Sequence, residues 1–99
     1  MSKRPRQHWR IDMHASAWKQ FNALTYEQKQ GVFDAMLPVL EADNPEHAPG
    51  VKKLEGKFRA FYRVRARTHR VVFEILRRTI GRFRGTLYIA DIVDRKDAY

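Results

Sequence analysis

Arginine recurs at alternate positions in one short segment of the chain. The positions are Arg59, Arg63, Arg65 and Arg67. In an extended strand, every second residue lies on the same face at intervals of about 7 Å, a spacing that suits adjacent phosphates or a phosphate and a base edge. Phe61 lies among these arginines, and Arg70 opens the next apolar run. The pattern therefore predicts an anion-binding face where guanidinium groups hold phosphate and the Phe61 ring stacks on a base.

An ordinary solvated sheet face is the alternative interpretation of this pattern. Such a face normally carries charges of both signs, because like charges directly opposite each other destabilise a sheet. Glu74 and Asp91 are the acidic residues that can relieve the crowding. The excess of arginine over these acids favours the anion-binding interpretation.

The charge of the whole chain is equally one-sided. Of the net charge of +9, residues 1–50 contribute nothing, whereas residues 51–99 carry fourteen basic and five acidic side chains. Ten of those fourteen are arginine, which suits phosphate better than lysine does. This distribution predicts a polyanionic partner: nucleic acid first, an anionic membrane surface second, and an acidic protein third. Residues 1–7 are expected to form a basic disordered arm that adds nonspecific attraction.

Several classes of protein are excluded by what the 99 residues lack. The chain has no cysteine, which excludes disulfides, thiolate zinc sites and cysteine nucleophiles. The four histidines show no metal-ligand spacing, and there is no glycine-rich phosphate loop or serine-elbow motif. We therefore expect no metal and no small-molecule cofactor. The absence of a long apolar run or a signal peptide predicts a cytoplasmic protein with no membrane partner.

The hydrophobic periodicity predicts an α+β fold in a single domain over residues 8–99. The expected elements are a strand over 8–13, helices over 15–24 and 26–42, and strands over 58–67, 70–76 and 86–93. The three later strands follow one another through short connections, so they are expected to form an antiparallel meander in one twisted sheet with the N-terminal strand.

Local signals refine the helical part of this prediction. Thr25 and Gln28 have capping-box spacing and are expected to start the second helix. Pro38 is expected to kink that helix or to end it a turn early. Trp9 and Trp18 are expected to anchor the core, and Phe33 is expected on the inner face of the second helix.

Four segments, in this order, resemble the toxins of the RelE/ParE superfamily of bacterial toxin–antitoxin pairs. They are Lys53-Leu54-Glu55-Gly56, Phe61-Tyr62-Arg63-Val64-Arg65, His69-Arg70-Val71-Val72-Phe73-Glu74-Ile75 and Asp94-Arg95-Lys96-Asp97-Ala98-Tyr99. The strand and paired helices that precede them also match the family's order of elements. The resemblance implies a RelE-like microbial ribonuclease fold.

The resemblance also implies a chemistry. The RelE branch cuts messenger RNA on the ribosome without a metal, through attack of a ribose 2′-OH on the adjacent phosphate. The family's catalytic set falls on Arg63, Arg65, Arg70, Arg95 and Tyr99. Further RNA contacts are expected from Lys52, Lys53, Arg59, Phe61, Arg67 and His69. His69 occupies a position where the family often has tyrosine, so it is an alternative proton donor.

Two other functions stay open at the level of sequence. A ParE-like toxin would inhibit DNA gyrase without catalysis and would depend on the helical hairpin over residues 15–42. Because Arg95 and Tyr99 match the closing motif of the RelE branch, the ribonuclease function is favoured. A plain nucleic-acid-binding module would bind with a steep salt dependence and cut nothing. The toxin interpretation implies a cognate antitoxin whose acidic or amphipathic segment covers the basic face.

Overall fold

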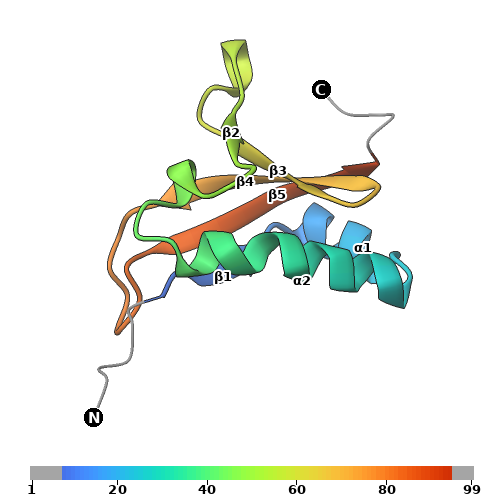
Figure 1. Ribbon diagram of the computed structural model, residues 1–99, viewed down its shortest axis with the longest axis horizontal. Coiled ribbons are helices and arrows are strands. Elements are labelled where there is room, and N and C mark those ends of the chain that lie inside the picture. The colour runs from blue at the N-terminus through green and yellow to red at the C-terminus, as the bar shows by residue number, and fades with distance from the viewer. Residues whose placement is uncertain (1–7, 95–99) are drawn as a thin grey trace.

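Five strands form one mixed sheet, and two helices lie against one of its faces (Figure 1). The structure is a computed structural model that describes residues 8–94. In chain order the elements are β1 (Arg10–Met13), α1 (Ala15–Asn22), α2 (Tyr26–Glu41), β2 (Lys52–Lys53), β3 (Tyr62–Ala66), β4 (His69–Leu76) and β5 (Thr86–Asp94). Single 3-10 turns lie at Pro45–His47 and Gly56–Phe58.

The strands are arranged in the order β1-β5-β4-β3-β2. β1 pairs in parallel with β5, whereas every other pair is antiparallel. The predicted α+β class is confirmed, with an N-terminal strand, a helical hairpin and the meander β3–β4–β5. The two-residue strand β2 was not predicted, because a pair of lysines carries no alternation signal.

A capping box starts α2, as its sequence predicts. The Thr25 hydroxyl accepts a hydrogen bond from the Gln28 backbone N–H at 3.2 Å, and the Gln28 side chain accepts one from the Thr25 N–H at 2.9 Å. The helix then continues through Pro38 to Glu41, so the predicted early end is wrong. Pro38 lies on the exposed side of α2, where water can hydrogen-bond the carbonyl that the proline ring leaves without a donor.

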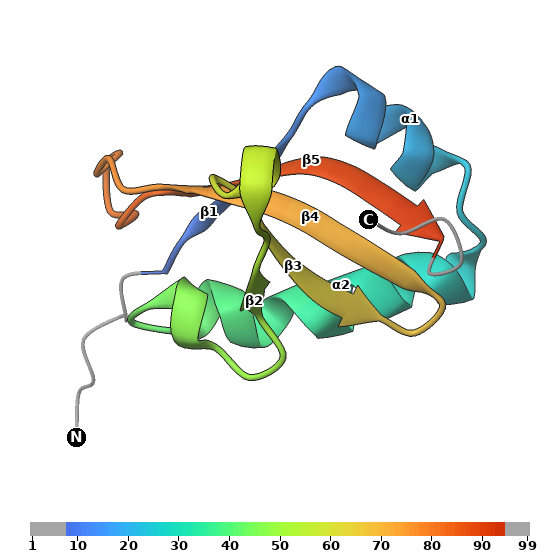
Figure 2. The same ribbon diagram turned by 90° about the horizontal axis from the view of Figure 1, so that it is seen from above.

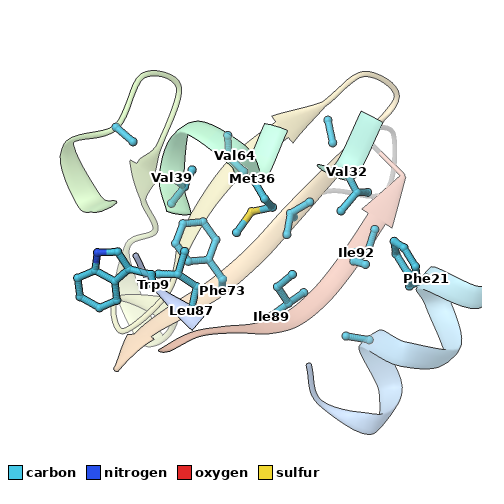
Figure 3. Close-up of a cluster of buried hydrophobic side chains, with 14 residues drawn as sticks. Trp9, Phe21, Val32, Met36, Val39, Val64, Phe73, Leu87, Ile89 and Ile92 are labelled. Atoms are coloured by element: carbon cyan, nitrogen blue, oxygen red, sulfur yellow. The ribbon is translucent and has the colours of Figure 1, made fainter. Parts of the chain in front are cut away.

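The hydrophobic core lies between the sheet and both helices (Figure 3). Its largest fully buried side chains include Phe73, Met36, Leu87 and Ile89. Trp9 is buried as predicted, and its indole N–H donates to the Ala42 carbonyl at 3.1 Å.

Two aromatic residues predicted for the core are exposed instead. Trp18 is 48% exposed and Phe33 is 54% exposed. Ala17 and Phe21, four residues apart, form the buried stripe of α1. Trp18 follows Ala17 and is therefore turned about 100° around the helix, toward solvent. Both exposed rings retain an edge-on contact with the Phe21 ring, at centroid distances of 6.1 and 5.7 Å. Neither helix of the described part has the length and hydropathy needed to cross a bilayer.

A β-bulge in β5 sets which of its residues face the core. Val72 is opposite Asp91, whereas the next residue of β4, Phe73, is opposite Ile89, so Ala90 is the extra residue. Without the bulge, Ile89 and Ile92 would lie on opposite faces, because side chains alternate along a strand. With it, both are buried in the core and Asp91 lies on the other face.

Candidate nucleic-acid interface

Neither helix of residues 8–94 covers the second face of the sheet, which we call the open face. Figure 2 looks onto this open face, with β3, β4 and β5 in front. Val64 and Ala66 of β3 are buried against the helix side. Because side chains alternate along a strand, Arg63 and Arg65 lie on the open face.

The strand register brings a third arginine to the same place. Arg65 pairs directly with Arg70, and Arg63 pairs with Val72. Directly opposite residues have Cβ atoms about 4.5–5.5 Å apart, and Arg63 is one repeat further along β3, at about 7 Å. Lys52 of β2 lies opposite Arg63 on its other side. We call Lys52, Arg63, Arg65 and Arg70 the arginine cluster.

The carboxylate of Asp91 lies on the same face of the sheet as the cluster. Asp91, opposite Val72 on β5, accepts a hydrogen bond from the Gln20 amide at 2.6 Å. The Gln20 carbonyl in turn accepts from the Ile92 N–H at 2.8 Å, so α1 holds this end of β5. Within residues 8–94, Arg63 and Arg65 form no ion pair. The cluster is therefore a concentrated positive region suited to a phosphate.

The segment before β3 differs from its prediction. Residues 56–58 form a 3-10 turn that Arg59 closes by donating its N–H to the Gly56 carbonyl. The strand therefore begins at Tyr62 rather than at residue 58, and the expectation that Arg59 lies on its face is wrong. Phe61 lies just before β3, half-buried, and its carbonyl accepts from the Leu54 N–H at 3.0 Å. In Figure 1 the segment between β2 and β3 projects from the open side of the sheet.

Arg67 lies on the helix side rather than with the cluster. It is in the β3–β4 turn, with a left-handed φ of 61°. Its aliphatic stem packs over Gly31 of α2, since a Cβ added at Gly31 would lie 3.2 Å from the Arg67 Cδ. The expected common face with Arg65 is therefore wrong, and the glycine in α2 has a packing role.

His69 is also placed away from the cluster. It pairs with Ala66 on β3 and with Asp94 on β5, which puts it on the helix side, and it is only 9% exposed. Its Nδ1 lies 3.0 Å from the Thr68 hydroxyl. The structure thus does not bring the His69 ring to the face where Arg65 and Arg70 lie.

The remaining predicted residues have different outcomes. Lys53 is exposed and pairs with Tyr62. Because it is adjacent to Lys52 in the strand, it lies on the opposite face of the sheet. Arg95 and Tyr99 lie outside the described residues, as does the predicted arm over residues 1–7. In the described part of the chain, no three histidine or acidic side chains gather closely enough to hold a metal ion.

Comparison with known proteins identifies relatives of this fold. No family model and no curated protein matches the sequence. Among solved structures, a YoeB/ParE toxin from Agrobacterium tumefaciens matches at 14% identity over 87% of this chain and 98% of its own, with a TM-score of 0.67. The archaeal RelE–RelB complex from Pyrococcus horikoshii matches at 21% identity over 91% and 98%, with a TM-score of 0.62. The RelBE2 toxin–antitoxin complex from Mycobacterium tuberculosis matches at 16% identity over 89% and 99%, with a TM-score of 0.56.

Proposed function

We propose that this chain, which has the fold of the RelE/ParE toxins, is the toxin of a toxin–antitoxin pair and cleaves RNA at the arginine cluster. The observation that carries the proposal is the direct pairing of Arg65 with Arg70 on the sheet face that neither helix of residues 8–94 covers. Like charges placed directly opposite each other repel, and both guanidinium groups would attract an RNA phosphate bound beside them.

The reaction is attack of a ribose 2′-oxygen on the adjacent phosphorus. The bond from phosphorus to the 5′-oxygen of the next nucleotide breaks, and the products are a 2′,3′-cyclic phosphate and a 5′-hydroxyl. Arg63, Arg65 and Arg70 stabilise the charge that develops on the pentavalent phosphorus. A guanidinium group is a planar fork of hydrogen-bond donors, so these three side chains bind and orient the phosphate.

Proton transfer needs additional groups. A base must take the proton of the 2′-OH, and an acid must protonate the leaving 5′-oxygen. The family resemblance gives these steps and further charge stabilisation to Tyr99 and Arg95, and we retain that assignment as part of the proposal. His69 is not included, because its ring lies on the helix side of the sheet.

The proposed partners follow from the open face and the solved relatives. Messenger RNA on the ribosome is the proposed substrate, with Lys52 beside Arg63 extending the phosphate-binding surface. Several of the similar structures are described as RelE–RelB complexes. We therefore propose a cognate antitoxin whose acidic segment covers the arginine cluster and blocks RNA.

A second candidate function is ParE-like inhibition of DNA gyrase. It is favoured by the apolar side chains that the helical hairpin presents to solvent. Trp18, Phe33 and Leu37 are 48%, 54% and 55% exposed. An exposed apolar surface of this kind is typical of a protein interface. In that case the helices, rather than the arginine cluster, contact the target.

Primer extension on a reporter message, after induction of the chain in a bacterial host, tests the proposal. We expect discrete cuts within translated regions, lost in Arg70→Ala and retained in Arg82→Ala, which removes an exposed arginine of the β4–β5 loop. Circular dichroism confirms that both variants fold. Growth arrest with intact messages and DNA damage would favour the gyrase function, and wild-type cutting by folded Arg70→Ala would contradict the proposed mechanism.

A further inference from the structure

A hollow lies on the open face at the end remote from the arginine cluster. The cluster is near the β3–β4 turn, whereas the hollow is where the β4–β5 loop begins, and Figure 2 shows these connections at opposite ends of the sheet. Its volume is about 590 Å³, within the range of small-molecule sites. Thr86 of β5 lies opposite Leu76 here, while Val93 lies opposite Arg70. Arg70 and Leu76 are six residues apart along β4, so about 20 Å of strand separates the two places.

Part of the lining of the hollow is apolar and aromatic. Leu76 and Ile80 line it and are 42% and 43% exposed. Tyr88 also lines it, and the Tyr88 ring is backed by the ring of His14, with centroids 4.0 Å apart and an interplanar angle of 37°. A supported aromatic ring beside aliphatic side chains is a surface on which a planar base stacks.

Another part of the lining is cationic, and two of its arginines have partners. Arg77 forms an ion pair with Glu46, and its guanidinium lies 5.6 Å from the centroid of the Trp9 ring. Arg10 donates from Nε to the Thr86 hydroxyl at 3.4 Å. Arg78 also lines the hollow and forms no ion pair within residues 8–94. Because Glu46 already pairs with Arg77, Arg78 is the side chain best placed to take an incoming phosphate.

One acidic residue distinguishes between anionic ligands. Asp12 lines the same hollow, where its carboxylate accepts from the Met13 N–H at 2.8 Å and lies 3.6 Å from Arg10. A peptide rich in carboxylates would be repelled by Asp12. A nucleotide has an anionic phosphate for Arg78 and also has sugar hydroxyls and base N–H groups that a carboxylate accepts.

We propose that this hollow binds one nucleotide. The base lies against Tyr88, Leu76 and Ile80, the phosphate is held by Arg78, and Asp12 accepts from the sugar or the base. The nucleotide is either a free mononucleotide or one residue of a single-stranded RNA. In the second case the inference rests on the proposed function, because an RNA several nucleotides long would reach both the hollow and the arginine cluster.

Fluorescence anisotropy of a labelled mixed-sequence RNA octamer, and calorimetric titration of 5′-AMP, test the proposal. Both use the full chain carrying Arg70→Ala, so that the octamer stays intact. Adding Arg78→Ala should weaken binding roughly tenfold, because a charge-assisted contact is lost. Adding Arg82→Ala should have less than a twofold effect, since Arg82 belongs to the same loop but does not line the hollow. Tyr88→Leu, which removes a ring and no charge, should weaken binding about tenfold even in about 300 mM salt.

The outcomes separate the sources of the ligand. Sensitivity of AMP binding to both Arg78→Ala and Tyr88→Leu supports a mononucleotide site, and sensitivity of the octamer alone supports an RNA subsite. If Arg78→Ala and Arg82→Ala weaken binding equally, the ligand is held only by general electrostatic attraction, and the proposal is overturned. It is equally overturned if neither ligand binds, or if only a polyglutamate peptide does. Message cleavage is measured in a separate assay, so the proposed ribonuclease function can be refuted without refuting the nucleotide site.

Discussion

Arg65→Gln should make the free protein more stable while it impairs RNA cleavage. Arg65 lies directly opposite Arg70 and forms no ion pair within the described residues. If the two guanidinium groups splay to about 7 Å, their repulsion in a water-like dielectric is about 0.6 kcal/mol. This agrees with the roughly 0.2–1 kcal/mol typical of cross-strand pairs. For a domain of this size, such a change raises Tm by about 2–5 °C.

Thermal melts monitored by circular dichroism provide the measurement. Arg82→Gln is the matched control, because it makes the same chemical change at an exposed loop arginine outside the sheet. The stabilisation by Arg65→Gln should largely vanish in about 1 M salt, where the Debye length is about 3 Å. Cleavage should fall roughly 10²- to 10³-fold, which is the usual cost of losing one donor to a transition-state oxyanion. A Tm that falls, or that rises equally in both variants, would refute the reasoning that the opposed arginines repel each other.

Three further predictions concern the framework of the fold. Gly85→Ala should cost about 3 kcal/mol or more, because its Cβ would lie 2.2 Å from the Leu76 carbonyl oxygen and 2.6 Å from the Trp9 ring; chemical denaturation measures the loss. Thr25→Ala should cost about 1 kcal/mol by removing the capping box, seen as a Tm several degrees lower. Burial raises the pKa of Glu46, but its backbone hydrogen bond and Arg77 outweigh this and lower that pKa. The stability that the Glu46 carboxylate contributes is therefore fully present above the ordinary carboxyl pKa, and it is lost as the pH falls through the lowered value. Thermal melts at several pH values should show a smaller loss of stability at low pH in Arg77→Gln.

The parts of the fold with strong periodic signals could be predicted from the sequence. The capping pair Thr25 and Gln28 gave the start of α2, and alternation gave β4 and β5 nearly in full. The errors came where tertiary packing decides. Nothing local distinguishes Trp18 from Ala17 as the outward position of α1, and a proline near a helix end costs little when its side of the helix faces water.

The candidate site was predictable only where alternation held. Arg63, Arg65 and Arg70 follow the two-residue period of β3 and β4, and the structure places them on one face. Arg59 and Phe61 match the same period in sequence but lie before the strand, because the 3-10 turn at Gly56–Phe58 interrupts it. The hollow at the β4–β5 loop had no sequence signal, since β1, β4 and β5 supply its lining from distant parts of the chain.

The pairing of Arg65 with Arg70 depends on the turn that joins β3 to β4. Ala66 pairs with His69, so only Arg67 and Thr68 lie between the strands, and this short connection fixes the register. Arg67 adopts a left-handed φ of 61°, which costs a non-glycine residue about 1–2 kcal/mol. Packing of its stem over Gly31 offsets that cost, and the gap exists because α2 has no side chain at this position. A glycine in a helix thus supports the turn, and the turn's register brings two arginines together on the opposite face of the sheet.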